Sequence, residues 1–275
     1  MRRSGEILPL LVALFGALLL LMGAARAQTT TLTEDDLYKA ETIVTGTGEA
    51  ERLRGFRVGA EEAVIKLTGK ARLATGQRIK PILDKAAELV ADFTYEDRMK
   101  GIPIHDEQGT RDRPHFLRIR FDKAQFDAVL MAARLKKWSG ARPLVAVWLA
   151  IREPRSKYVL ASEGPEGYGP REVLKDVSVK RGVPIVLPPP GDSPVTYDVI
   201  DKSIWHVIQQ ESNKLNAPAV LYCTLDFDGN VGWNTRWTLA APRTYAKWSM
   251  KGVTFDAALK GAIEHAAAAF AEKAK

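Results

Sequence analysis

The ten residues Arg142 to Ile151, Arg-Pro-Leu-Val-Ala-Val-Trp-Leu-Ala-Ile, form a nearly unbroken apolar run near the middle of a 275-residue chain. β-Branched residues recur within the run, and charge returns directly after it at Arg152 and Glu153. A strand with one face in water would alternate apolar and polar residues. Because this run does not alternate, it predicts a strand buried on both faces, as in a sheet covered by helices.

The residues after this strand predict a mixed-sheet α/β domain over 139–275, with Ser139-Gly140 marking its start. Hydrophobic periodicity and turn residues give the order β-α-β-α-β-β-β-α. The expected elements after the first strand are a loop at 152–170, a helix at 171–180, a strand at 183–187, a helix at 197–215, strands at 218–227, 231–240 and 245–251, and a helix from 255. Strand-helix-strand connections predict parallel pairing of the first three strands. The Asp228-Gly229-Asn230 turn predicts an antiparallel hairpin at the edge of the same sheet.

The residues before the strand predict a compact α+β domain over 28–138 with the order β-α-α-β-β-α. The expected elements are strands at 37–45, 93–99 and 116–121, helices at 49–68 and 77–90, and a helix that Asp122 caps with Gln125 as its capping-box partner. The buried stripe of the first helix is expected to consist of Leu53, Phe56, Ala60, Val64 and Leu67. Gly55 and Gly59 interrupt this helix at a cost of about 1 kcal/mol each relative to Ala, which indicates close packing against another backbone.

Residues 1–27 have the features of a signal peptide. Arg2 and Arg3 precede an apolar run at 7–23, and Ala25-Arg26-Ala27 places small residues at the two positions that signal peptidase reads. Cleavage is therefore expected between Ala27 and Gln28, which predicts a periplasmic location. The alternative is an uncleaved leader that anchors the protein in the inner membrane, because the run approaches the length that spans a bilayer.

The composition is that of an ordinary globular protein, with 46% hydrophobic and 27% charged residues. The formal charge is +7, of which three leader arginines against Glu6 account for +2, leaving +5 on the mature chain. Lysine and arginine look spread along the sequence rather than clustered. A soluble surface with a modest charge excess is the favoured interpretation, and weak binding of anionic polymers is the alternative. No nucleic acid partner is expected.

Sequence motifs for catalysis or metal binding are absent. There is no GxSxG, P-loop or GxGxxG motif, and no pair of the four histidines shares a three- or four-residue helical spacing. Cys223 is the single cysteine, which excludes an internal disulfide, and its apolar strand context predicts a buried, inert thiol. We therefore nominate no catalytic, cofactor-binding or metal-binding residue and expect no cofactor.

Two loops could bind ions. Asp226, Asp228 and Asn230 resemble the first half of a calcium loop, but a hairpin turn explains them better because no bidentate Glu follows at the required distance. The glycine-rich stretch 164–170 precedes a helix whose amides could receive an anion beside Arg171. Its prolines remove N–H groups, so a flexible loop is the favoured interpretation.

Three tryptophans near the end of the chain could form another binding surface. Trp233 and Trp237 share one strand face, with Trp248 on the next strand, and an exposed strip of this kind could stack sugars or bases. Burial beneath helices is favoured, because the intervening Asn234, Arg236 and Thr238 form a natural solvent face.

Four stretches carry a resemblance to a known family. They are Leu37-Tyr38-Lys39-Ala40, Ala63 to Gly69, Phe116 to Asp122, and Trp138 to Ala150, together with the strand-rich segment around Trp233 and Trp237. With these pieces the chain resembles the bacterial domain-of-unknown-function 2066 family. The resemblance implies an exported envelope protein without an assigned activity, and it carries over no site residue. In element order alone, the second half is also similar to α/β domains of periplasmic accessory proteins such as those that assist peptidoglycan synthases.

Three functional hypotheses follow. The first is a non-enzymatic accessory protein that binds another envelope component, a protein or polymer, through its α/β domains. The second is an enzyme acting on an envelope polymer or small molecule, with its site at the C-terminal ends of the parallel strands, where ligands of open α/β sheets bind. The loops 152–170 and 188–196 would then supply the titratable groups Glu163, Glu166, Arg171 and Asp192. The third is the binding of anionic polymers.

Overall fold

The computed structural model describes residues 32–102, 112–140 and 142–274, arranged around two sheets. The first is three-stranded in the order β1-β3-β2, and the second is six-stranded in the order β5-β4-β7-β8-β9, with β6 paired to β4. The fold is therefore α+β with a mixed second sheet, as predicted. The leader, the cleavage site at Ala27 and Gln28, and His105 lie outside the described residues. Within the described ranges, every helix is too short or too polar to cross a membrane.

The N-terminal unit, which we define as residues 32–137, contains the three-stranded antiparallel sheet and its helices. Its elements are β1 (Lys39–Thr45), α2 (Glu49–Thr68), α3 (Lys80–Asp84), β2 (Val90–Asp97), β3 (Pro114–Phe121) and α4 (Lys123–Ala132). The predicted order of strands and helices is confirmed. The side chain of Asp122 accepts a hydrogen bond from the Gln125 N–H at 2.9 Å, so the predicted cap of α4 is confirmed as well.

Helix α2 packs on one face of this sheet through its glycines. A Cβ on Gly55 would lie 2.5 Å from Leu117 Cδ2, and one on Gly59 would lie 2.6 Å from Ile119 Cδ1. The close packing expected at these glycines is confirmed, but the atoms that they meet belong to side chains of the sheet and not to its backbone. The prediction that Leu53 is buried is wrong: it is 42% exposed, because Gly55 and Gly59 are the residues that face the sheet at this end of α2.

The prediction of one continuous helix at 77–90 is wrong. The structure has 3-10 turns at Ala71–Thr75, Gln77–Ile79 and Ala86–Leu89, with the five-residue α3 among them. The predicted inward residues Ile79, Ile82 and Ala86 are nevertheless buried. Val90, expected on the buried face of this helix, is the first residue of β2, so the chain leaves helical geometry earlier than the apolar pattern indicates.

The C-terminal unit, residues 138–274, contains the six-stranded sheet. Its elements are β4 (Val145–Arg152), β5 (Lys157–Val159), α5 (Tyr168–Arg181), β6 (Ile185–Val186), α6 (Tyr197–Asp201), α7 (Trp205–Lys214), β7 (Ala219–Asp228), β8 (Gly232–Ala241), β9 (Thr244–Val253) and α8 (Phe255–Lys273). β4 is parallel to β6 and β7, and β7, β8 and β9 are successively antiparallel, as predicted.

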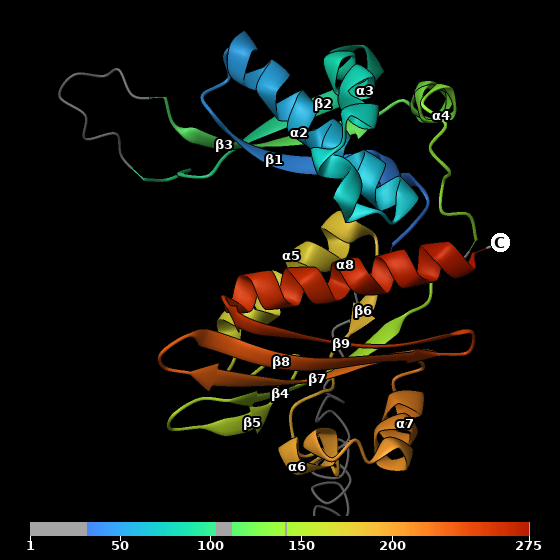
Figure 1. The fold of residues 1–275 in the computed structure, drawn as a ribbon. Coiled ribbons are helices and arrows are strands. Elements are labelled where there is room, and N and C mark those ends of the chain that lie inside the picture. Colours follow the sequence, from blue (N-terminus) through green and yellow to red (C-terminus); the bar gives the residue numbers. More distant parts are fainter. Residues whose placement is uncertain (1–31, 103–111, 141, 275) are drawn as a thin grey trace, which may run out of the picture.

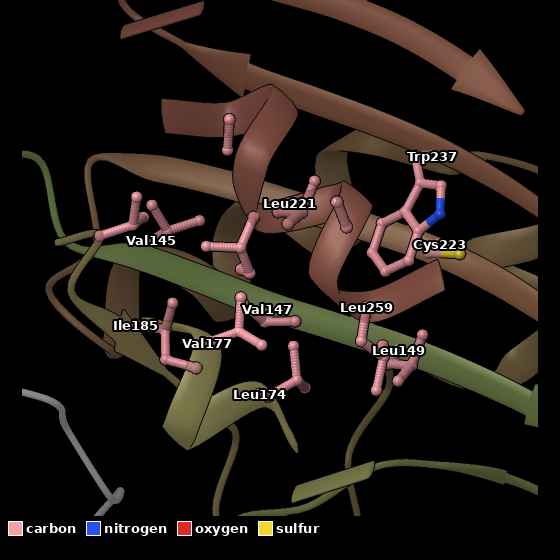
Figure 2. Close-up of a cluster of buried hydrophobic side chains, with 14 of the residues drawn as sticks. Val145, Val147, Leu149, Leu174, Val177, Ile185, Leu221, Cys223, Trp237 and Leu259 are labelled. Carbon is pink, nitrogen blue, oxygen red and sulfur yellow. The ribbon is translucent and has the colours of Figure 1, made fainter. Parts of the chain in front are cut away.

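Strand β4 is the centre of this unit. Every residue from Val145 to Ile151 is buried, which confirms a strand covered on both faces. Figure 1 shows α5 and α8 on one side of the sheet and α6 and α7 on the other. In Figure 2, Val147 of β4 lies close to Leu174 and Val177 of α5 within the same apolar cluster. Each such buried Val or Leu contributes about 1.5–3 kcal/mol relative to exposure.

Two segments of this unit differ from prediction. The helix expected at 197–215 is interrupted at Ser203, whose φ of 52° is left-handed, so it forms α6 and α7. The loop expected at 152–170 contains β5, which pairs with the end of β4 in an antiparallel hairpin. A left-handed serine and a three-residue strand are both too local for hydrophobic periodicity to indicate.

The two units are held together at Arg142. Its guanidinium donates to the Lys66 carbonyl at the end of α2 and to the Gly182 carbonyl after α5, both at 2.7 Å. It also lies 3.9 Å above the ring of Trp138, which stacks on Phe270 of α8. We call this contact the Arg142 joint. It places α5 and α8 between the six-stranded sheet and the N-terminal unit (Figure 1).

Candidate functional site: a cleft between the two units

A cleft of about 760 Å³ opens between the three-stranded sheet and α5. One wall is the sheet face opposite α2, and the other is the exposed side of α5. Glu62 and Lys66 of α2 also line the cleft. The sheet wall carries Lys39, Glu41, Asp92, Thr94, Arg118 and Arg120, and the α5 wall carries Glu172, Lys175, Asp176, Val179 and Lys180.

The alternation of β3 explains the sheet wall. Leu117, Ile119 and Phe121 are buried beneath α2, so Arg118 and Arg120 point to the opposite face. Arg118 lies opposite Glu41 on β1, with which it forms an ion pair at 2.8 Å. It forms a second ion pair at 2.5 Å with Glu96 on β2. Cross-strand ion pairs of this kind keep the central arginine of the wall in place.

The α5 wall is paired in the same way. Lys175 bonds Glu172 at 2.9 Å and Lys180 bonds Asp176 at 2.8 Å, both at helical spacings that place the partners side by side. Across the described residues, no ion pair joins the sheet wall to the α5 wall. The cleft is therefore open, and each wall presents charges that its own neighbours have neutralised.

Lys66 lies almost fully buried where α2 meets β1. Its Nζ contacts Glu62 Oε1 at 3.2 Å and donates to the carbonyls of Lys39 at 2.7 Å and Asp36 at 3.3 Å. Burial lowers the pKa of the Lys66 ammonium and raises the pKa of the Glu62 carboxyl. With three oxygen partners, Lys66 fixes the start of β1 against α2 and is not available to a ligand.

The edge of β1 is occupied by α2 side chains along its length. Lys66 bonds the Lys39 carbonyl, Arg54 donates to the Ile43 carbonyl at 3.0 Å, and Glu51 accepts from the Thr45 N–H at 3.0 Å. An open strand edge is a template for pairing with another chain, and these contacts cover it.

The four titratable residues expected at the C-terminal ends of the parallel strands are not brought together. Glu163 and Glu166 are exposed. Arg171 is buried, and its guanidinium donates to the Glu166 and Gly164 carbonyls at 2.5 Å each, so it fastens the glycine-rich loop instead of facing an anion. Asp192 lines a separate hollow of about 400 Å³, beside Lys157.

A cluster that sequence reasoning missed lies at the same edge of the sheet. Asp226 ends the buried part of β7, and in the parallel register it is paired with Arg152 of β4. Its carboxylate accepts from Arg152 Nε at 3.0 Å and from the Tyr197 hydroxyl at 2.5 Å. Burial, together with the bond to Asp226, raises the pKa of Tyr197, so the phenol stays protonated. The available signal was that Arg152 and Asp226 each follow an apolar strand directly.

The remaining sequence candidates have structural roles. Asn230 N–H donates to Asp228 Oδ1 in the β7–β8 turn, and the described residues contain no group of three potential metal ligands. Trp237 is buried beneath α8 and stacks on Trp248 at 6.2 Å, which confirms the favoured interpretation for this residue, whereas Trp233 is only half-buried. Cys223 is buried, which confirms the predicted burial of the thiol, and burial raises its pKa well above the ordinary value.

Comparison with known proteins finds a match for the N-terminal unit. The family described as a domain of unknown function (DUF8605) matches residues 32–139. This part of the chain is an uncharacterised domain. It includes α2 and the three-stranded sheet, hence the sheet wall of the cleft, and it ends at Ser139, directly after Trp138 of the Arg142 joint. No curated protein and no solved structure matches the chain.

Proposed function

We propose that the protein is an exported, non-enzymatic accessory protein of the cell envelope that binds a segment of another envelope protein in the cleft. The leader at residues 1–27 supports export to the periplasm. The observation that carries the proposal is the cleft itself, whose two walls come from different units and have no ion pair between them in the described part of the chain.

The lining favours a protein segment with charges of both signs. The cleft is lined by six acidic and six basic side chains, so a ligand of a single sign gains no advantage there. The pairs on each wall are mostly exposed, and such pairs are worth only about 0–1 kcal/mol, so exchanging them for pairs with a partner costs little. Val179 of α5, which is 44% exposed, offers an apolar contact between the charges.

Site-specific crosslinking tests this proposal. A photo-crosslinking residue in place of Val179 is expected to give one reproducible adduct with an exported protein when the full chain is produced in cells. The matched position is Val231, which is 57% exposed in the β7–β8 turn, far from the cleft residues in sequence. The absence of an adduct at Val179, or the same adduct at both positions, would contradict the proposal.

An enzyme with a site at the C-terminal edge of the second sheet is the alternative proposal. The hollow beside Asp192 and Lys157 favours it, whereas Arg152, Asp226 and Tyr197 at that edge satisfy one another. Saturation-transfer NMR with soluble envelope fragments would support this alternative if fragments bind the wild type but not an Asp192→Ala, Lys157→Met variant. Equal signals from both proteins would argue against it.

We also propose that the likeness to the domain-of-unknown-function 2066 family reflects common ancestry. The stretches that carry it form the end of α2, strand β3 with its cap, and the joint with β4. A structure of a member of that family supports this proposal if an arginine bonds carbonyls of both units where Arg142 does here, and counts against it if the units are joined differently.

A further inference from the structure

A second hollow, of about 610 Å³, lies on the N-terminal unit and shares no lining residue with the cleft. It is bounded by the end of α2, the 3-10 turns that follow it, and the residues after α4. All of its charged lining residues within the described ranges are basic, and we call it the basic pocket. They are Lys70, Arg72, Arg78, Arg134 and Lys136.

These five cations have no anionic partner in the part of the chain that the structure describes. Among the described residues, no carboxylate lies within ion-pair distance of any of them, whereas the adjacent Lys137 bonds Asp127 at 2.9 Å. Five like charges around one hollow repel one another and destabilise the folded chain. A concave surface lined by one sign of charge also concentrates ligands of the opposite sign. The pocket therefore has the electrostatic character of an anion site.

The pocket is built from two stretches of sequence without acidic residues. Residues 63–83 and 128–152 contain no Asp or Glu, and the fold places their basic side chains around one hollow. Gly69, with φ 69°, turns the chain after α2. After α4, Leu135 N–H donates to the Leu130 carbonyl, which closes the turn at Arg134.

Arg134 occupies this turn at a cost. Its φ of 54° is left-handed, a conformation that costs a residue with a Cβ energy and that glycine adopts freely. A glycine would therefore suit the backbone better at this position. Strained residues of this kind cluster at ligand sites, and here the strain places a guanidinium at the pocket.

The side chains indicate the chemistry of the ligand. A guanidinium is a planar fork that bonds two phosphate oxygens at once, and an ammonium adds a compact charge. Leu73 and Leu135 line the pocket beside the cations, so a ligand with an apolar or sugar portion gains contacts that a bare ion would not. The volume lies in the range of small-molecule sites. We propose that the basic pocket binds a phosphate-bearing ligand, independently of the partner bound in the cleft.

Binding measurements on the full chain test this proposal with two probes that separate the sources of phosphate. Inorganic pyrophosphate represents a soluble phosphate compound, and phosphatidylglycerol vesicles represent a lipid headgroup, with phosphatidylcholine vesicles as the uncharged comparison. The test variant is Arg72→Gln, Arg78→Gln, Lys136→Gln, three exposed side chains of the pocket. The matched variant is Arg243→Gln, Lys251→Gln, Lys260→Gln, which removes three exposed, unpaired cations from the C-terminal unit of the described chain.

The wild type is expected to bind at least one charged probe, and the test variant to lose about tenfold or more in affinity. The matched variant should stay within about twofold of the wild type, because its net charge falls equally but the pocket is intact. Pyrophosphate binding assigns a soluble ligand, and binding of phosphatidylglycerol alone assigns a lipid headgroup. Binding of neither probe, affinity retained by the test variant, or equal loss in both variants overturns the proposal. Far-UV circular dichroism of both variants establishes that each is folded.

Discussion

Glu51 joins the start of α2 to the end of β1. Its carboxylate accepts from the Arg54 guanidinium at 2.7 Å and from the Thr45 N–H at 3.0 Å. The bond from Arg54 and the bond from the Thr45 N–H together hold the pKa of Glu51 at about 2, below its ordinary value of 4.5. The folded chain therefore prefers the ionised form of this residue.

This preference predicts a pH-dependent contribution to stability. A carboxyl whose folded pKa is depressed stabilises the fold above its unfolded pKa, and the effect is lost as the pH falls towards the folded pKa. Urea unfolding should show Glu51→Gln to be less stable than the wild type at pH 7. The difference should shrink between pH 4.5 and pH 2. A difference that stays constant over that interval would show that the Glu51 carboxylate is not stabilised in the fold.

Single residues were predictable from sequence where their partners are near in the chain. The Asp122 cap needs only Gln125, and the burial of Cys223 needs only an apolar strand. Arg142 and Arg171 were not predictable, because they donate to backbone carbonyls. Every residue carries such a carbonyl, and for Arg142 the acceptors lie 40 and 76 positions away.

Among the elements, α2 approaches its sheet more closely than a helix with side chains on that face could. The atoms that a Cβ on Gly55 would meet are Leu117 Cδ2 at 2.5 Å and Val44 Cγ1 at 2.9 Å. Gly169, in the first turn of α5, is a suitable comparison, since a Cβ there would make only ordinary contact with Phe255 at 3.6 Å. Both glycines lie in helices, but only Gly55 is required by packing.

Gly55→Ala is therefore expected to destabilise the protein by about 1 kcal/mol or more, because overpacking exceeds the gain in helix propensity. Gly169→Ala should change the stability by less than about 1 kcal/mol, since the gain in helix propensity is offset by Pro170, which disfavours helical geometry at a preceding residue with a Cβ. Urea unfolding of the two variants measures both effects. Shifts of the same sign and size would mean that α2 does not depend on the glycine.

The extents of the elements were less predictable than their existence. Apolar periodicity continues through 79–89 and through 197–208, so each stretch resembled one helix. The apolar side chains are buried as long as they keep pointing toward the core. A series of short turns achieves this as well as one continuous helix does. Ser203 carries no sequence signal for its left-handed backbone, in contrast to Gly182, which ends α5 in the left-handed conformation that glycine favours.

In the molecule as a whole, every tryptophan lies in the C-terminal unit, so tryptophan fluorescence reports on that unit only. All six lie at position 138 or later: Trp138, Trp148, Trp205, Trp233, Trp237 and Trp248. Indole fluorescence therefore follows the C-terminal unit and the joint, whereas far-UV circular dichroism follows both units. Comparing the two signals shows whether the units unfold together.

Arg142→Met is expected to separate the unfolding of the two units. The change leaves two carbonyls without their charged donor, at a cost of about 3–6 kcal/mol, since each such bond is worth about 1.5–3 kcal/mol. Burial lowers the pKa of Arg142 to about 10, so the wild-type guanidinium is protonated at pH 7. The fluorescence and dichroism transitions should coincide in the wild type and diverge in the variant. Arg243→Met, at an exposed turn, should leave them coincident, and coincidence in both variants would exclude Arg142 as the joint.

The architecture was predictable from the sequence at this scale, but the cleft and the basic pocket were not. Both hollows depend on how separate stretches are placed relative to one another, which local patterns do not determine. A signal for the pocket was nevertheless present in the two stretches without acidic residues, 63–83 and 128–152. Treating the charge as evenly spread was wrong, because counting lysine and arginine ignores where aspartate and glutamate are missing.

The side chains that occupy the edge of β1 constrain how any partner can be recognised. With the Lys39 and Ile43 carbonyls and the Thr45 N–H already bonded, an incoming segment has little opportunity to continue the sheet at that edge. Peptides that extend a sheet are selected mainly by their main chain and tolerate many sequences. A segment that lies along β1 would instead be selected by its side chains, so N-methylation of its amides should matter little and changing its residues should matter a great deal.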